Sequence, residues 1–171
     1  MITLDYARTM ARYTVWQNNS LMAAADGLND IARWQDRGAF FRSIAETLNH
    51  ILGDDVTWLA RLEGRQTEAE RLGARFPYTD APRDWEIYKK ERQAANAALV
   101  TWAENLSDAA LSTQTSWQRG AEQVETLFAF NVAHLFNHGT HHRGQVHAML
   151  TAAGAEPEPT DLQMLLVRPQ P

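Results

Sequence analysis

Five of the six histidines in the sequence lie within fourteen residues of its C-terminal third, between His134 and His147. If this stretch is helical, residues four positions apart lie on the same face, with Cβ atoms about 6 Å apart. His134, His138 and His142 then form one line, and Gln145 lies near its end. Two imidazoles one turn apart can chelate a single divalent cation. The spacing therefore predicts that His138 and His142 are metal ligands.

This stretch differs from the metal-binding helix of zinc proteases. That helix reads His-Glu-x-x-His, and its glutamate acts as the general base. Here the three residues between His138 and His142 are Gly-Thr-His, which disfavours a protease of this type. Glycine inside a helix costs about 1 kcal/mol relative to alanine. Gly139 and Gly144 therefore suggest the close approach of another helix or a ligand, or crowding by neighbouring aromatic side chains.

His50 is the only histidine outside this stretch, and it lies in the middle of an apolar stripe. A histidine at the centre of one helix can reach the centre of a neighbouring helix at the usual spacing of about 8–10 Å. Asp54 lies one turn after it on the same face. The set His50, His138 and His142 would leave coordination positions open for water or substrate, as catalytic metal sites do.

Each of these residues also has a purely structural interpretation. His50 alone would more often be a hydrogen-bonded core residue than a ligand. Asp54 would be solvated or would orient a helix, and His134 would either support the site or simply pack above it. His141 and His147 are expected at the surface or beside the ligands. The tryptophans are most simply core or interface residues.

Hydrophobic periodicity predicts four long helices. They run from about Thr3 to Gly27, from Phe40 to Leu62 (later if Ser43 and Glu46 form a capping box), from an Asp84 N-cap to Leu106, and from Glu122 to Ala153. Residues 64–83 lack a period and contain several glycines and prolines, so we expect a loop. Residues 111–120 suggest a short β-hairpin or an irregular turn. The proline-broken tail from 155 is expected to lie along the helices through Leu162, Leu165 and Leu166.

These elements predict an all-α fold, a four-helix bundle with a short irregular or hairpin segment before the last helix, as one domain over residues 1–171. The formal net charge of −5 argues against nucleic-acid and anionic-membrane partners. No stretch is long and apolar enough to span a membrane, and the first residues do not resemble a secretory signal. We therefore expect a cytoplasmic protein.

The sequence contains no cysteine. Any metal must be held by nitrogen and oxygen ligands, and any thiol chemistry must use a small-molecule thiol. Three neutral imidazoles suit zinc or nickel, with iron, copper and cobalt as alternatives.

Three separated segments resemble the DinB family, whose name refers to damage-inducible genes. The segment His134–Gln145 is similar to the signature helix of this family. The segment Thr47–Trp58 is similar to the helix that carries the family's first ligand, and Ala11–Asn19 is similar to the family's N-terminal motif. Thr160-Asp161-Leu162 fits the usual tail of the family.

The resemblance implies a four-helix bundle, commonly homodimeric, with a divalent metal held by His50, His138 and His142. Relatives in the wider superfamily are similar to transferases and isomerases that use a low-molecular-weight thiol. We therefore expect a metal-dependent enzyme, a transferase or hydrolase, acting on a small molecule. In that interpretation Arg143 or Gln145 would steer an anionic substrate or orient a ligand. The alternatives are a non-catalytic metal-binding protein of the stress response and a helical interaction protein without metal.

Overall fold

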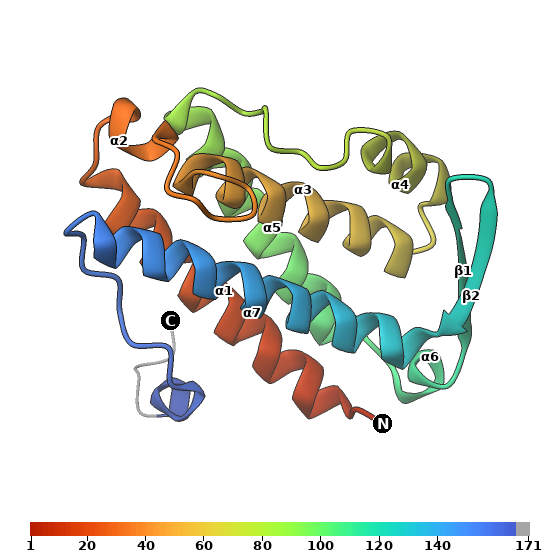
Figure 1. The fold of residues 1–171 in the computed structure, drawn as a ribbon. Coiled ribbons are helices and arrows are strands. Elements are labelled where there is room, and N and C mark those ends of the chain that lie inside the picture. The colour runs from red at the N-terminus through yellow and green to blue at the C-terminus, as the bar shows by residue number, and fades with distance from the viewer. Residues whose placement is uncertain (167–171) are drawn as a thin grey trace.

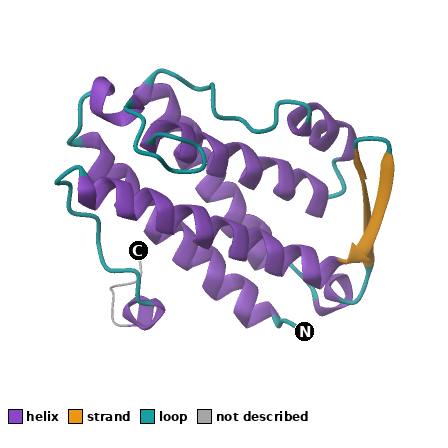
Figure 2. Ribbon diagram, in the orientation of Figure 1, coloured by secondary structure: helices purple, strands orange, loops and turns teal. Residues whose placement is uncertain are grey.

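The computed structural model describes residues 1–166, apart from the side chain of Arg119. It is mostly helical, as the sequence predicts, with one small antiparallel sheet (Figures 1 and 2). The elements in chain order are α1 (Leu4–Asp26), α2 (Asp30–Trp34), α3 (Ile44–Leu62), α4 (Gln66–Gly73), α5 (Trp85–Asn105), α6 (Asp108–Leu111), β1 (Gln114–Arg119), β2 (Glu122–Leu127), α7 (Phe128–Ala152) and the 3₁₀ helix η1 (Leu162–Leu166).

Side-chain caps fix where the long helices begin. The Asp84 carboxylate accepts a hydrogen bond from the backbone N–H of Ile87, as predicted for the start of α5. Helix α3 begins at Ile44 rather than Phe40, because Ser43 Oγ accepts the N–H of Glu46 at 3.1 Å. This is the later of the two predicted starts. Phe40 and Phe41 therefore lie in the turn before α3 and not on the helix itself.

The segment before the last helix is the β-hairpin that the sequence allowed. Its second strand contradicts the predicted start of the last helix at Glu122, since α7 begins only at Phe128. Val124 pairs with Trp117 across the hairpin, and Thr126 pairs with Thr115. Alternating β-branched side chains favour a paired strand over a helical turn.

Helix α4 contradicts the prediction that residues 64–83 form a loop throughout. Ala69 is buried, and α4 packs on α3. The glycines and prolines of this segment lie at or beyond the ends of the helix, so they do not interrupt it. The rest of the segment, residues 74–83, is an irregular connection that leads to α5 (Figure 1).

The four long helices pack in a ring, with α3 against α7, α7 against α1, α1 against α5 and α5 against α3. Two apolar clusters fill the two ends of this arrangement. Between them lies a buried polar layer. Arg92 of α5 forms a 2.7 Å ion pair with Asp55 of α3, and Asn18 of α1 donates to Asn96 of α5. The layer joins the helices through these polar contacts, although Nε and Nη2 of Arg92 have no hydrogen-bond partner within the described residues.

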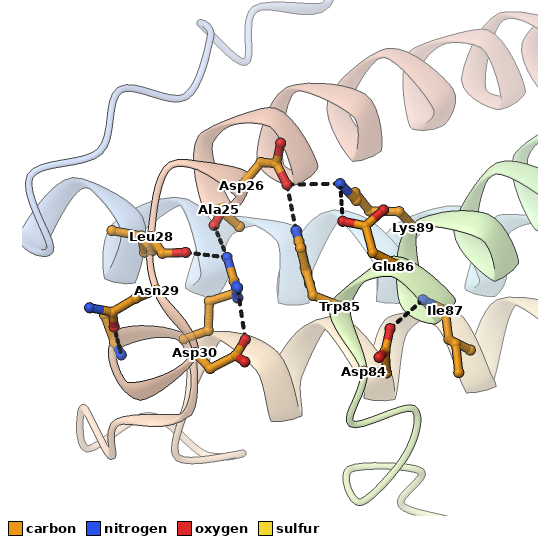
Figure 3. A network of polar contacts seen from close by, with 12 residues as sticks. Ala25, Asp26, Leu28, Asn29, Asp30, Asp84, Trp85, Glu86, Ile87 and Lys89 are labelled. Carbon is orange, nitrogen blue, oxygen red and sulfur yellow. Dashed lines mark hydrogen bonds and ion pairs between the residues drawn. The ribbon is translucent and has the colours of Figure 1, made fainter.

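Polar contacts also join α1, α2 and α5 at the end of the molecule away from the hairpin (Figure 3). Asp26 accepts hydrogen bonds from Trp85 Nε1 at 2.6 Å and from Lys89 Nζ at 3.0 Å. Arg33 of α2 donates to the carbonyl of Ala25 and pairs with Asp30. These contacts hold the short α2 in place beside the start of α5.

The tail after α7 returns along α1, but by polar contacts rather than through the three predicted leucines. Tyr13 donates to the carbonyl of Thr160 at 2.7 Å, and Gln17 donates to that of Pro159. Leu162 and Leu166 are exposed and Leu165 is half-buried, because η1 projects away from the helices. The last five residues lie outside the described part. Among the described residues, no helix combines the length and apolar character needed to cross a membrane.

Candidate metal centre

His50 of α3 and His138 and His142 of α7 meet between the two helices. One ring nitrogen from each lies within 4.8 Å of those of the others. The Nε2 atoms of His50 and His138 are 3.1 Å apart. His50 and His142 are buried, and His138 is partly exposed. The structure thus brings together the three histidines that the spacing and the resemblance predict as ligands.

His50 owes its orientation to the connection between α4 and α5. Its Nδ1 lies 2.9 Å from the carbonyl oxygen of Pro77. A carbonyl can only accept, so Nδ1 carries the proton and Nε2 presents a bare lone pair to the cluster. Phe41 stacks on the other side of this ring, with centroids 3.9 Å apart. His50 is therefore fixed in both tautomer and position.

The connection is itself attached to one face of α3. Asn49 Nδ2 donates to the carbonyls of Thr79 and Pro82 at 3.3 and 3.1 Å. Thr57 Oγ1 lies 3.1 Å from the hydroxyl of Tyr78. A Cβ at Gly53 would lie 2.3 Å from Cγ of Tyr78, so only glycine leaves room for that ring. We call residues 76–82 the strap, because α3 holds them against His50.

The two histidines of α7 are oriented differently. His142 Nδ1 lies 2.8 Å from Gln145 Oε1, one turn along the same helix. Gln145 Nε2 lies 3.2 Å from His141 Nε2, which fixes the amide so that its oxygen faces His142. His138 Nδ1 lies 3.0 Å from a carboxylate oxygen of Asp54, without the alignment of a full hydrogen bond. Acceptors that hold the distal nitrogen of a histidine orient it as a ligand.

Burial keeps these imidazoles neutral. It lowers the pKa of His50 to about 4 and that of His138 to about 3, and it also lowers the pKa of His142. Neighbouring imidazoles lower the pKa of His138 further, since each would repel a second positive charge. Burial raises the pKa of Asp54 to about 7. At neutral pH the cluster thus offers nitrogen lone pairs, the form in which histidine binds metal ions.

The donor set fits a divalent cation. Two nitrogens bound to one tetrahedral zinc ion at about 2.0 Å lie about 3.3 Å apart, close to the observed 3.1 Å. His50 and His142 both present a bare Nε2 to the same point. His138 could satisfy only His50 by donating a hydrogen bond, whereas a shared cation satisfies all three. The three ring nitrogens could therefore hold one divalent ion.

Comparisons with known proteins give this geometry a family. The model of the DinB family matches residues 1–168. The chain belongs to the DinB family. It is similar to Protein DinB of Bacillus subtilis (strain 168), with 26% identity over 166 residues, 95% of this chain and 94% of that protein. Its fold is similar to the crystal structure of a DinB-like protein from Bacillus cereus ATCC 10987, with a TM-score of 0.60 and 19% identity over 84% of this chain and 90% of that one.

In this DinB-family chain the remaining predicted residues are placed as follows. Asp54 lies against His138, and Gln145 contacts His142. His134 is exposed, and its ring lies 5.7 Å from that of His138 and 4.8 Å from that of Trp58. Arg143 points away from the cluster into the buried polar layer. There it donates to Thr140 Oγ1, and burial lowers its pKa to about 10. Arg143 therefore does not face an incoming substrate.

Gly139 and Gly144 have different explanations. A Cβ at Gly139 would lie 2.7 Å from Nη1 of Arg143, so this glycine leaves room for the buried guanidinium rather than for another helix or a ligand. A Cβ at Gly144 would meet no heavy atom within 4 Å. Nothing in the structure requires glycine at Gly144.

The sequence alone did not reveal Pro77, Tyr78 and Phe41 as parts of the site. Pro77 and Tyr78 belong to a segment without a period, and Phe41 was assigned to the helix itself. One signal was present: Gly53 interrupts a strongly apolar helix three residues after His50. Glycine inside a helix indicates close approach of another group, which here is the ring of Tyr78.

Proposed function

We propose that this chain is a divalent-metal-dependent enzyme that activates a water molecule or a small thiol for reaction with a small-molecule substrate. The observation that supports the proposal is the convergence of His50, His138 and His142, each with its Nδ1 against an oxygen acceptor. Three protein nitrogens leave a tetrahedral ion with a position for a further ligand. A bound divalent ion lowers the pKa of a water or thiol at that position.

The surrounding residues would hold the ligands and shield them from solvent. The strap carbonyl and Gln145 fix two of the tautomers, and Asp54 faces the third imidazole. Phe41 covers the ring of His50. We infer that the four long helices act as a four-helix bundle, whose rigid α3 and α7 keep the ligands at a constant separation. The chain has no cysteine, so a reacting thiol would have to be a separate molecule.

Zinc or nickel suits this nitrogen-rich set best, with iron, copper and cobalt as alternatives. The first test is the metal content of protein purified without a histidine tag. Wild type should carry one ion per chain, and His138→Ala should lose it. His147→Ala is the matched control, because His147 lies on the same helix outside the cluster and should leave the content unchanged. Full metal content in His138→Ala would refute the assignment.

A second candidate function is metal binding without catalysis. It is favoured by the position of two clefts in the described part of the chain. One is small and lies between α2, α3 and α5, and the other, of about 350 Å³, lies between α4 and the hairpin. Neither is lined by any of the three histidines.

Turnover distinguishes the two functions. Metal-loaded protein would be offered epoxides, activated halides and maleyl compounds with several cellular thiols. An enzyme should form product with the metal and lose this activity in His138→Ala, whereas His147→Ala should remain active. Stoichiometric metal binding with no turnover across the panel would favour the non-catalytic function.

A further inference from the structure

Two exposed phenylalanines border the candidate metal centre. Phe40 is 81% exposed and Phe76 is 63% exposed, which makes them the two most exposed aromatic side chains among the described residues. They belong to separate segments, the turn before α3 and the strap. A single exposed apolar side chain is ordinary, but exposed apolar groups that gather at one place mark binding sites. The position of both rings beside one cluster therefore calls for an explanation.

Phe76 contacts one of the candidate ligands directly. Its ring lies edge to face with the imidazole of His50, with centroids 5.8 Å apart. It makes a second edge-to-face contact, also at 5.8 Å, with the ring of Tyr78. These two contacts use only part of the ring, because most of the side chain remains exposed. The exposed apolar surface of Phe76 thus begins at the His50 imidazole.

Phe40 is joined to the same cluster by Phe41. The two phenyl rings meet edge to face at 4.8 Å. Phe41 in turn stacks on His50 at 3.9 Å and lies 5.2 Å from the ring of His142. These two successive ring contacts cannot span more than about 9 Å, so Phe40 lies close to the imidazole that Phe76 touches. Phe41 is buried, and Phe40 is therefore the member of this pair that a ligand can reach.

Hydrogen-bonded turns hold the backbone of both phenylalanines. The turn that carries Phe40 is closed by the N–H of Arg42, which donates to the carbonyl of Ala39 at 2.8 Å. The N–H of Phe76 donates to the carbonyl of Gly73 at 3.1 Å. A ligand that packs on these rings would thus meet side chains whose backbone is already ordered. Such preorganisation lowers the entropic cost of binding.

The three histidines leave the rest of a bound substrate outside the cluster. His50 and His142 are buried, and His138 is only partly exposed. Neither of the two clefts described above is lined by these histidines. A substrate whose reacting atom is at the metal would therefore rest its remaining atoms on side chains that border the cluster. Phenyl rings in that position favour aromatic or bulky apolar groups, because such groups bury the most apolar surface against them.

We propose that Phe40 and Phe76 bind an aromatic or bulky apolar group of the substrate, next to the atom that reacts at the metal. The inference rests on the proposed function, which supplies the metal end of the substrate. It names the substrate class more closely: among epoxides, activated halides and maleyl compounds, those with an aromatic or bulky apolar substituent should react best. It also gives the turn before α3 and the strap a role in specificity.

A matched pair of metal-binding probes tests this assignment. Cobalt-loaded protein is titrated with benzohydroxamate and with acetohydroxamate, which share the metal-binding group and differ in phenyl against methyl. The visible absorption of the bound cobalt reports binding. Wild type should bind benzohydroxamate about tenfold more tightly, the gain expected when roughly 60 Å² of additional apolar surface leaves water. Equal affinities for the two probes in wild type would overturn the proposal.

Substitutions assign the preference to the two rings. Phe40→Ala and Phe76→Ala should each lower it about threefold, and the double variant should lose it. Both side chains are largely exposed, so their removal should cost little stability, and unchanged cobalt content shows that the site is intact. Phe130→Ala is the matched control, because it removes an exposed phenyl ring from the first turn of α7 and should leave the preference unchanged. A preference of wild-type size in the double variant would contradict the proposal.

The measurements separate this inference from the proposed function and from self-association. Cobalt content is measured before any probe is added, and a wild type that takes up no cobalt refutes the proposed function together with this inference. Full cobalt content with equal affinities for the probes refutes this inference alone. Light scattering compares the mass of wild type with that of the double variant. A lower mass in the double variant would show that the two rings meet a second copy of the chain, and it would overturn the assignment to substrate.

Discussion

The two helices that carry the candidate ligands orient them in different ways. On α7, His138 and His142 are one turn apart, and the acceptor for His142 is Gln145 on the same helix. On α3, the acceptor for His50 is the carbonyl of Pro77, 27 residues further along the chain. The α7 part of the site follows from the geometry of a single helix. The α3 part depends on a separate segment folding against it.

This difference indicates where the site is vulnerable. A helix keeps its own side chains in register, so the α7 pair needs only α7 to form. The strap has no regular backbone hydrogen bonding of its own, and Asn49, Gly53 and Thr57 hold it on α3. We therefore expect changes beneath the strap to weaken metal binding more than changes beside the α7 ligands.

The largest effect should come from a methyl group beneath the strap. Gly53→Ala would place a Cβ 2.3 Å from the ring of Tyr78, so Tyr78 and the Pro77 carbonyl must shift. We expect metal affinity to fall about 100-fold, since the orientation of His50 is lost. Overpacking should also lower the free energy of unfolding by about 1–3 kcal/mol. Isothermal titration with zinc and urea unfolding measure the two effects.

Gly144→Ala on α7 is the matched control, because its Cβ would meet no atom within 4 Å. It should leave metal affinity unchanged and raise the free energy of unfolding by up to about 1 kcal/mol, since alanine favours a helix more than glycine does. Equal losses of affinity in the two variants would contradict the distinction between the helices.

A smaller effect is expected from removing the acceptor on α7. Gln145→Ala leaves His142 without its partner, and metal affinity should fall about tenfold. Gln145→Glu keeps an oxygen acceptor and should retain most of the affinity. Competition with a chromogenic chelator measures both. A loss in Gln145→Ala greater than that in Gly53→Ala would reverse the ranking of the two sides.

A further effect, independent of the metal, should appear in the pH dependence of stability. Folded His138 binds its proton only near pH 3, whereas unfolded histidine does so near 6.5. Between these values the unfolded state binds more protons, so the free energy of unfolding of wild type should fall as the pH drops below 6.5. His138→Gln lacks this contribution.

The difference between wild type and His138→Gln in chelator-containing buffer isolates this contribution, because the other titrating groups are present in both. His50→Gln provides the α3 counterpart, and its contribution should level off nearer pH 4. A wild type that gains stability relative to either variant on acidification would contradict the lowered pKa values.

The same contrast explains what could be predicted from the sequence. The long helices were predictable because amphipathic periods and the caps at Ser43 and Asp84 are local signals. The pair on α7 was predictable because two residues four positions apart on a helix lie on the same face. His50 required the further step of pairing two helices by their centres, and the resemblance supported that step.

The rest depends on contacts between distant segments. Hairpin strand β2 and helix α4 are short, and tertiary packing rather than propensity decides their conformation. The strap acts through a backbone carbonyl, which any residue at position 77 would supply, so no side-chain pattern reveals it. Arg143 directly follows His142 in the sequence, and only the fold shows that its side chain enters the buried layer.

The most direct test of the metal centre is X-ray absorption spectroscopy at the edge of the metal bound to tag-free protein. We expect scattering from three imidazoles and from at least one lighter ligand that is not histidine. In His50→Ala the imidazole contribution should fall to two, which shows that α3 supplies one ligand and α7 the other two. A spectrum without imidazole scattering, or one that none of the substitutions of His50, His138 and His142 changes, would contradict the account.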